Sequence, residues 1–417
     1  MDTNQVSLDA NEMKDFIQHI IDNNRFIQKQ GKKVVATEII GDSGLGKTSV
    51  ALQIAAANNL NYIKLNLAQI EELGDLVGFP VRQFKLTKPP TAVMKKFKTA
   101  EGKIVEKRVV SEEVTEWIDE NAVDQYTKNG YQFTGKKRMG YCPPEWIADI
   151  EGGGILILDD WNRADIRFIQ AIMELVDRQE YISWKLPEDW HIVLTANPDD
   201  GEYLVNSIDV AQRTRFISIV MKWNHEVWAE WAEKEGLDGR CINFVLMHPE
   251  VVTARVNPRS ITTFFNAISS FENFNQKLPM IQMIGEGSVG PELATVFAVF
   301  IKNRLDKLIG PKDIILGKDE NVVVKALLEA ITEGNPNDYR ADIASLLTTR
   351  IINWTVNYSQ NNPITPEIIE RISMLIKNAD IFTDDLKYHI VKKILNGNKQ
   401  KFQKLLFDSD IQEIATK

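Results

Sequence analysis

The stretch Lys32–Asn58 decides the fold, and it reads KKVVATEIIGDSGLGKTSVALQIAAAN. An apolar, β-branched run over Val34–Ile40 predicts a strand, and the amphipathic segment that begins at Lys47 predicts a helix. Between them lies GDSGLGKT, which matches the pattern G-x-x-x-x-G-K-[ST] in its strand–loop–helix context. Glycines in such a loop let successive backbone N–H groups surround phosphate oxygens, and the N-terminus of the helix faces the same anion.

The loop therefore predicts a site for nucleotide phosphates and magnesium. Lys47 supplies a mobile positive charge to the phosphates, and Thr48 offers its hydroxyl to Mg²⁺. A chance match in a glycine-containing loop is the alternative, which the flanking strand and helix make rare. The residues predicted to bind the nucleotide are Gly41, Asp42, Ser43, Gly44, Leu45, Gly46, Lys47 and Thr48.

Two further strands are predicted to bring polar side chains to this loop. The run Gly154–Leu158 is apolar throughout, as in a parallel strand buried on both faces, and it ends in Asp159 and Asp160. We assign Asp159 to the magnesium shell and Asp160 to polarising the attacking water. A strand that simply runs into a polar turn is the alternative. The apolar run His191–Ala196 is followed by Asn197, whose side-chain amide is placed to hold that water.

The composition is that of a soluble globular protein. The chain has 417 residues, of which 44% are hydrophobic and 26% charged, and a formal net charge of −9. No apolar run approaches the roughly 20 residues of a membrane span, and the acidic N-terminal segment does not resemble a secretory signal, so we expect a cytoplasmic location. The two cysteines predict neither a disulfide framework nor a metal cluster. The acidic balance disfavours a general nucleic-acid coat, because phosphate binding depends on lysine and arginine.

Together these motifs resemble the MoxR-like branch of the AAA+ ATPases, in the form found in bacteria and phages. The stretches that carry the resemblance over about 32–271 are, in chain order, the phosphate loop, DLVGFPV at 75–81, PPEWI at 143–147, DDWNRA at 159–164, TANP at 195–198, QRTRF at 212–216 and NPRS at 257–260. The resemblance implies a parallel α/β core of the AAA+ P-loop type with inserted hairpins, a helical lid and a helical C-terminal extension. It also implies adenine rather than guanine nucleotides.

The resemblance assigns catalytic roles to two arginines. Arg215 is expected to reach the nucleotide of the adjacent subunit, with Arg213 as the second choice, and Arg259 to contact the phosphates from its own lid. A shared site of this kind implies a ring, expected to be a hexamer, that acts on a protein substrate or on a partner with a von Willebrand A-like domain. This chain departs from the family in having Asp160 where glutamate is usual. A shorter side chain misplaces the water, and about 1 Å of misplacement can slow a reaction about a hundredfold.

We expect three domains along the chain. An ATP-binding α/β domain spans 1–223, a helical lid 224–310 and a helical extension 311–417. The first of these carries an enlarged insert over about 82–141, with a hairpin at Met94–Val110 that turns at Ala100–Lys103. A second hairpin is expected at Glu180–Trp190, where three aromatic residues either contact substrate or simply pack.

Three functions remain open at this stage. The first is an ATP-driven machine that remodels a protein. The second is a nucleic-acid motor, supported only by the Arg82–Arg108 part of the insert, where nine lysines and arginines face two glutamates. A run of charged residues like this is about as often a solvated surface without a partner as it is a binding surface. The third is a nucleotide-gated assembly protein with weak hydrolysis, for which Asp160 is the motive.

Overall fold

The computed structural model describes residues 6–98, 104–253, 255–303, 305–332 and 338–416. The predicted turn at Ala100–Lys103 lies outside the described residues. The chain divides into two compact units by its internal contacts. The first contains residues 1–6, 14–41 and 47–220, and the second contains 7–13, 42–46 and 221–417. No helix among the described residues is long and apolar enough to cross a membrane.

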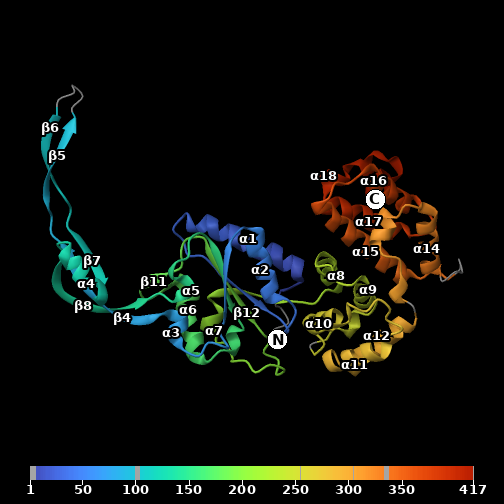
Figure 1. The fold of residues 1–417 in the computed structure, drawn as a ribbon, viewed down its shortest axis with the longest axis horizontal. Coiled ribbons are helices and arrows are strands. Elements are labelled where there is room, and N and C mark those ends of the chain that lie inside the picture. Colours follow the sequence, from blue (N-terminus) through green and yellow to red (C-terminus); the bar gives the residue numbers. More distant parts are fainter. Residues whose placement is uncertain (1–5, 99–103, 254, 304, 333–337, 417) are drawn as a thin grey trace. The chain divides into compact units, whose positions relative to one another are not determined.

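A parallel sheet forms the centre of the first unit (Figure 1). Five strands lie side by side in the order β13-β2-β12-β9-β3, and every neighbouring pair is parallel. Their bounds are β2 Ala36–Ile40, β3 Asn61–Asn66, β9 Gly154–Asp159, β12 Trp190–Ala196 and β13 Phe216–Met221. The strand that leads into the phosphate loop is thus separated from the acidic strand by β12, which is fully buried. The expected α/β core is confirmed.

Helices cover this sheet and close its core. The bounds are α1 Ala10–Gln28, α2 Lys47–Ala57, α3 Leu73–Val77, α5 Glu145–Ala148, α6 Ile166–Arg178 and α7 Val210–Arg213. One apolar cluster joins β9 and β12 to α6, and at its centre Trp161 and Trp190 are completely buried. Helix α1 begins directly after Asp9, whose side chain accepts hydrogen bonds from the backbone N–H groups of Asn11 and Glu12.

The insert forms a β-structure of its own, which we call the arm (residues 79–142). Strands β4 Phe79–Lys88, β7 Val114–Asp119 and β8 Gln132–Cys142 make an antiparallel sheet in the order β7-β4-β8. It continues into the antiparallel hairpin of β5 Ala92–Lys98 and β6 Ile104–Val110, and α4 Val123–Lys128 connects β7 to β8. One face of the sheet is covered, because Leu86 and Ile118 are buried there. Gly78 directly precedes the arm, and any Cβ there would collide with the carbonyl of Cys142.

The second predicted hairpin is present but short, and its aromatic residues are packed. Strands β10 Glu180–Tyr181 and β11 Trp184–Lys185 pair antiparallel. The Trp184 indole donates to the Val77 carbonyl at 2.9 Å and meets the Trp146 ring edge-on at 5.6 Å. Tyr181 meets Tyr141 edge-on at 5.9 Å. These contacts favour the packing interpretation over substrate contact.

The second unit is helical. Its helices are α8 His225–Lys234, α9 Gly239–Met247, α10 Pro258–Ile268, α11 Leu278–Ser288, α12 Pro291–Lys302, α13 Pro311–Leu316, α14 Glu320–Thr332, α15 Ala341–Asn361, α16 Pro366–Lys377, α17 Asp384–Gly397, α18 Lys399–Phe402 and α19 Ser409–Thr416. They enclose two apolar clusters, one built on the phenylalanines of α9, α10 and α12 and the other on the aliphatic residues of α13 to α19. The helical C-terminal region expected from the sequence is confirmed.

A buried ion pair links these two clusters. Arg350 of α15 donates from Nε to Glu233 of α8 at 2.7 Å, and both side chains are at least nine-tenths buried. The guanidinium also donates to the Gly239 carbonyl and to Asn243 of α9. Arg350 thereby satisfies acceptors on both α8 and α9, so its removal leaves a carboxylate buried without a counter-charge.

We predict that Arg350→Met lowers the free energy of unfolding of the second unit by about 3–5 kcal/mol, because Glu233 stays charged and buried. Urea denaturation followed by far-ultraviolet circular dichroism measures this. The double variant Glu233→Met/Arg350→Met is the control and loses less stability than the single variant, because it leaves no unpaired charge. Equal losses in the two variants would contradict this account.

Candidate nucleotide site

The phosphate loop has the backbone that its glycines were predicted to supply. Its first residue, Gly41, donates its N–H to the carbonyl of Ala196 on β12 at 3.2 Å, which ties the loop to the neighbouring strand. Gly44 has φ +79° and Gly46 φ +98°. These angles belong to the left-handed region that other residues enter only with strain. The helix α2 then begins at Lys47, so its N-terminal end faces the loop.

Lys47 is buried and points back into the loop. Only 7% of it is exposed, and its Nζ donates to the Gly41 carbonyl at 2.6 Å and to Asn197 Oδ1 at 3.1 Å. One acceptor belongs to the first residue of the loop, and the other belongs to the residue that follows β12. An ammonium in this position can donate to a phosphate oxygen bound by the loop.

Asp159 is the point at which three elements meet. Its Oδ1 accepts hydrogen bonds from Thr48 of α2 at 2.7 Å and from Thr195 of β12 at 2.6 Å. Its Oδ2 forms an ion pair with Lys64 of β3 at 2.8 Å. Burial alone would raise the pKa of Asp159, but the hydrogen bonds from Lys64, Thr195 and Thr48 outweigh it and hold the pKa below its usual value. The carboxylate is therefore ionised at neutral pH, as a metal ligand must be.

Asp160 and Asn197 also lie side by side. The Asn197 Nδ2 donates to Asp160 Oδ1 at 3.1 Å, and the Asp160 N–H donates to Thr195 Oγ1 at 3.1 Å. Asp160 has φ +51°, which is uncommon outside glycine and turns its carboxylate away from the direction of the strand. The side chain of Asn162 holds the backbone of Asn197. Its Nδ2 donates to the Asn197 carbonyl at 2.8 Å, and its Oδ1 accepts from the Asn197 N–H at 3.2 Å. The amide thus has a fixed orientation between Lys47 and Asp160.

Two supporting residues escaped the sequence analysis. Lys64 was not predicted as a site residue. Its visible signal was a lysine within the alternating pattern of the strand Asn61–Asn66. Glu38 lies on β2 with 2% exposure, and its carboxylate accepts from the Trp161 indole at 2.8 Å and from the Ser218 hydroxyl at 2.5 Å. Burial raises the pKa of Glu38. An acid inside the apolar run Val34–Ile40 was its visible signal.

The two arginines at the start of β13 lie elsewhere on the first unit. Arg215 is partly exposed and donates from Nη1 to the carbonyl of Ala211 in α7 at 3.0 Å. Arg213 is exposed, and its charge acts on the buried Glu38. The contacts described for these arginines include none of the predicted nucleotide or metal residues of their own chain. Their predicted role on a neighbouring copy stays a prediction.

Arg259 lies beside the phosphate loop residues that belong to the second unit. A Cβ built on Gly44 would collide with Asn257 Oδ1 and would lie 3.1 Å from Arg259 Cβ. Only glycine fits there, both for this reason and because of its positive φ. Asn257 also caps α10, with its side chain accepting from the Ser260 N–H at 3.0 Å. The start of α10 is therefore packed directly on the loop backbone.

The side chains present fit Mg²⁺ and a nucleoside triphosphate. Thr48 and the ionised Asp159 supply the hard oxygen donors that Mg²⁺ prefers, and the loop amides with Lys47 supply donors for phosphate oxygens. Among the described residues there is no cluster of three or more histidine, cysteine, aspartate or glutamate side chains that would hold a metal by themselves. This agrees with a Mg²⁺ ion bound jointly by one carboxylate, one hydroxyl, substrate phosphates and water.

Comparison with known proteins adds little beyond this geometry. Two solved structures of variants of RuvB from Thermotoga maritima are similar to the chain, one with 10% identity over 79% of this chain and 85% of that one at a TM-score of 0.33. The other has 12% identity over 90% and 87% at 0.29. No protein-family model and no curated protein sequence matches. At such TM-scores the assignment of the fold depends on the strand order and the site residues. The fold itself is a parallel α/β sheet in which the G-x-x-x-x-G-K-[ST] loop joins β2 to α2.

We predict that Lys64→Met raises the pKa of Asp159, because burial then acts with less opposition. Asp159 with a lowered pKa keeps its charge until the pH falls through that value, so wild-type activity persists into acid. In the variant, Mg²⁺-dependent turnover should fall at a higher pH than in the wild type, because a raised pKa lets Asp159 take up its proton earlier as the pH drops. A pH–rate profile measures this, with Lys185→Met as the matched control on β11. Superimposable acid limbs would contradict the role of Lys64.

Proposed function

We propose that the protein is an oligomeric, Mg²⁺-dependent ATPase of the MoxR type that remodels a protein partner. The observation that carries the proposal is the convergence of Lys47, Thr48, Asp159, Asp160 and Asn197 at the carboxyl ends of three adjacent parallel strands. Each of these groups has a distinct part in phosphoryl transfer. The preference for adenine comes from the family resemblance.

The mechanism follows from the hydrogen bonds around the γ-phosphate position. Lys47 and the loop amides would hold the phosphates, and Thr48 and Asp159 would hold Mg²⁺, which would supply positive charge to the phosphate oxygens. Asp160 polarises the attacking water, and the Asn197 amide, which bonds both Asp160 and Lys47, fixes the distance between the water and the phosphate. Arg259, at the start of α10, has its Cβ close to Gly44 of the loop, and we assign its charge to the phosphates.

A shared site accounts for Arg215. Phosphoryl transfer in this fold class is accelerated by an arginine that approaches the γ-phosphate from outside the phosphate loop. Arg215 is partly exposed and contacts none of the nucleotide residues of its own chain, which supports a role on the nucleotide of an adjacent copy. A ring of copies in which each supplies Arg215 to the next is the arrangement that this implies.

We predict that Arg215→Ala lowers ATP turnover by about 10³-fold while ATP binding to the single subunit changes little. Arg213→Ala is the matched control two residues away and retains most of the turnover. Lys47→Ala should instead lose ATP binding itself. Binding of a fluorescent ATP analogue and release of phosphate measure the two properties separately. Loss of binding in Arg215→Ala would assign Arg215 to the nucleotide pocket of its own chain and contradict the shared site.

A separate prediction concerns Asp160, the residue assigned to polarising the attacking water. Replacement by asparagine removes the base and should lower turnover by about 10²–10⁴-fold, with ATP binding retained. Replacement by glutamate adds the missing methylene group and should raise turnover by about tenfold, because the carboxylate then comes closer to the water. Steady-state phosphate release from the two variants and the wild type decides this. An Asp160→Glu variant slower than the wild type would show that this chain is built around the shorter side chain.

A further inference from the structure

The arm carries opposite charges on its two edges. Strand β7 and the turns around it contain six acids and no lysine or arginine between Val109 and Thr127. Strand β8 and its approach contain four lysines and arginines and no acid between Gln125 and Pro144. In the sheet order β7-β4-β8 these two strands are the edges, and no further strand pairs with either of them among the described residues.

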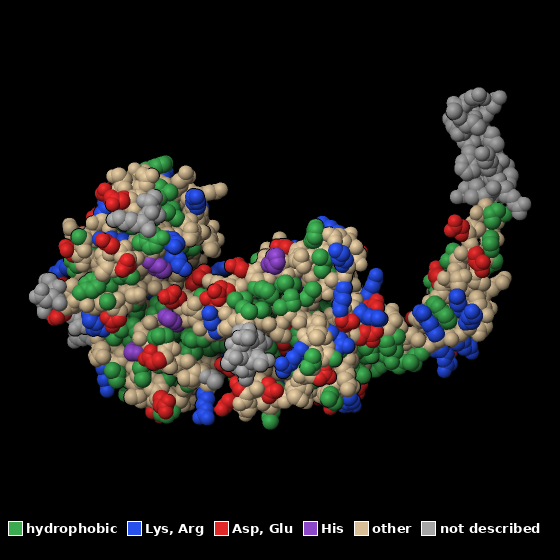
Figure 2. Space-filling model, turned by 180° about the vertical axis from the view of Figure 1, so that it is seen from behind, with side chains coloured by type: hydrophobic (Ala, Val, Ile, Leu, Met, Phe, Trp, Pro, Cys, Tyr) green, Lys and Arg blue, Asp and Glu red, His purple; other side chains and the backbone are tan. Residues whose placement is uncertain are grey.

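This separation changes the interpretation of the arm as a nucleic-acid surface. Over residues 79–92 and 110–142, which leave out the β5–β6 hairpin with its six basic and two acidic residues, there are seven basic and six acidic residues, so the three-stranded sheet is nearly neutral. Figure 2 shows lysine and arginine side chains gathered on one part of the arm, with acidic side chains on another part of the same face. A phosphate backbone that followed this sheet would meet a row of carboxylates on β7.

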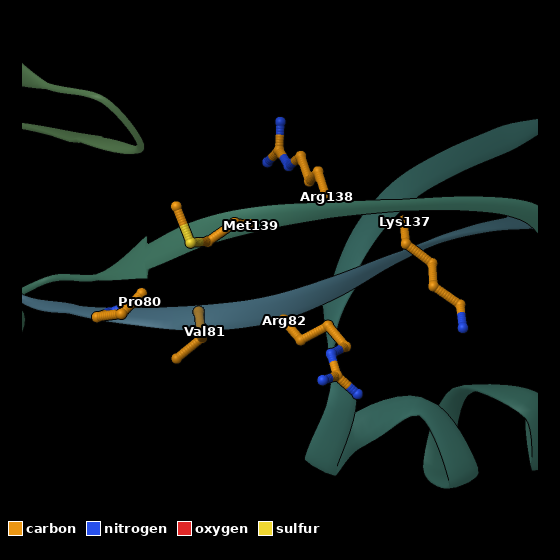
Figure 3. Close-up of a pocket in the computed structure, with 6 residues that line it drawn as sticks. All are labelled: Pro80, Val81, Arg82, Lys137, Arg138 and Met139. Carbon is orange, nitrogen blue, oxygen red and sulfur yellow. The ribbon is translucent and has the colours of Figure 1, made fainter.

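The hollow at the base of the arm is not an anion pocket either. It measures about 450 Å³ and is lined by Pro80, Val81, Arg82, Lys137, Arg138 and Met139. Figure 3 shows Arg138 pointing to one side of the two strands and Arg82 and Lys137 to the other. The strand register agrees, because Arg138 lies opposite Gln83 while Lys137 lies opposite Phe84. Cations that do not converge cannot surround one phosphate.

The charges are instead matched across the sheet, row by row. Asp119, Gln83 and Arg138 lie opposite one another on the three strands. Arg138 Nε donates to Gln83 Oε1 at 2.8 Å, and Gln83 Nε2 donates to Asp119 Oδ1 at 2.9 Å. On the other face Lys137 shares a row with Ile118, and Glu116 lies two residues along from it on that same face. Each face thus carries an acid on β7 and a base on β8. Within one copy the Arg138 guanidinium lies 4.6 Å from the Trp117 ring centroid on β7, and the Lys137 Nζ lies 5.1 Å from the Phe84 ring centroid on β4, so both cations must turn outward to meet a second copy.

We propose that arms of neighbouring copies of this chain meet edge to edge, β8 of one against β7 of the next. Arg138 then faces Asp119 of the next copy, and Lys137 faces Glu116 of the next copy. The row Asp119–Gln83–Arg138 repeats from copy to copy as a continuous chain of polar contacts. Because the two edges differ, the contact is head-to-tail and compatible with a closed ring. The proposal extends the oligomer of the proposed function, on which it depends, by naming a contact outside the ATPase core.

Protection of the edges against aggregation is the competing explanation. Charged edge strands commonly prevent uncontrolled pairing, and lysines on both edges would do so by repulsion between copies. Opposite signs on the two edges have the reverse effect, because they attract a second copy in one orientation only. Exposed ion pairs each change an equilibrium constant only a few-fold, so the edges select and orient the neighbour while the cores supply most of the affinity.

The test uses charge reversal on each edge. One variant carries Lys137→Glu and Arg138→Glu, and the other carries Glu116→Lys and Asp119→Lys. Each alone places like charges face to face, so we expect the protein concentration for half-assembly with Mg²⁺ and ATP to rise by about tenfold. An equimolar mixture of the two variants restores assembly near the wild-type concentration, because each reversed edge then meets its complement. Sedimentation velocity measures all three samples.

Two controls separate this contact from a defect in folding or in the core. A chain with all four reversals should assemble like the wild type, which shows that the reversed residues do not prevent folding. Lys85→Glu/Lys88→Glu reverses two charges on the central strand β4 and should leave assembly unchanged.

Three results would overturn the proposal. In the first, wild-type assembly is normal and the edge variants assemble equally well, which leaves the ATPase ring standing without an arm contact. In the second, the wild type binds a single-stranded oligonucleotide, and this binding is lost equally in Lys137→Glu/Arg138→Glu on β8 and Lys85→Glu/Lys88→Glu on β4. Mixing the two edge variants then does not restore assembly. In the third, the wild type does not assemble, and the proposed function fails as well.

Discussion

The carboxylate of Asp159 is the constraint on which the site depends. It ends β9, and it holds Thr48 of the first turn of α2, Thr195 of β12 and Lys64 of β3 within hydrogen-bond distance. Because each partner belongs to a different element, the carboxylate fixes the phosphate loop relative to three strands at once. Its low pKa follows from the same contacts, since they stabilise the charged form against burial. A buried and ionised acid beside a phosphate loop is the arrangement that a magnesium ion requires.

The order of the strands explains why the site can assemble at all. Placing β12 between β2 and β9 puts Asn197 between Lys47 and Asp160, where its amide contacts both. If β9 were the neighbour of β2, that amide would have no place between the cation and the acid. The glycine at position 44 has a comparable role on the other side of the loop, because its missing side chain lets α10 lie against the backbone. The fold thus supports the site by topology and by close approach.

Much of this site was predictable, because parallel strands bring their carboxyl ends to one edge of the sheet. Apolar runs marked β9 and β12, and the residues just after them were therefore expected to meet the phosphate loop. Lys64 and Glu38 were not predicted, since a strand lysine and a strand glutamate ordinarily face solvent and only the register shows what they contact. The opposed edges of the arm were hidden for the same reason: the sequence showed an excess of lysine, and strand pairing assigned the acids to one edge. The boundary expected between the lid and the C-terminal extension stays a prediction.

The arm and the core bear on the same question, which is whether the chain works alone. Among the described residues, the contacts of Arg215 include none with the predicted nucleotide residues of its own chain, and the arm carries acids on its β7 edge and bases on its β8 edge. The proposed function and the proposed arm contact each assign a part to a neighbouring molecule. The most direct measurement is the specific activity of wild-type ATP hydrolysis over about a hundredfold range of protein concentration with saturating Mg²⁺ and ATP. A specific activity that rises with concentration to a plateau is predicted, and one that is constant over the whole range would contradict a site shared between copies.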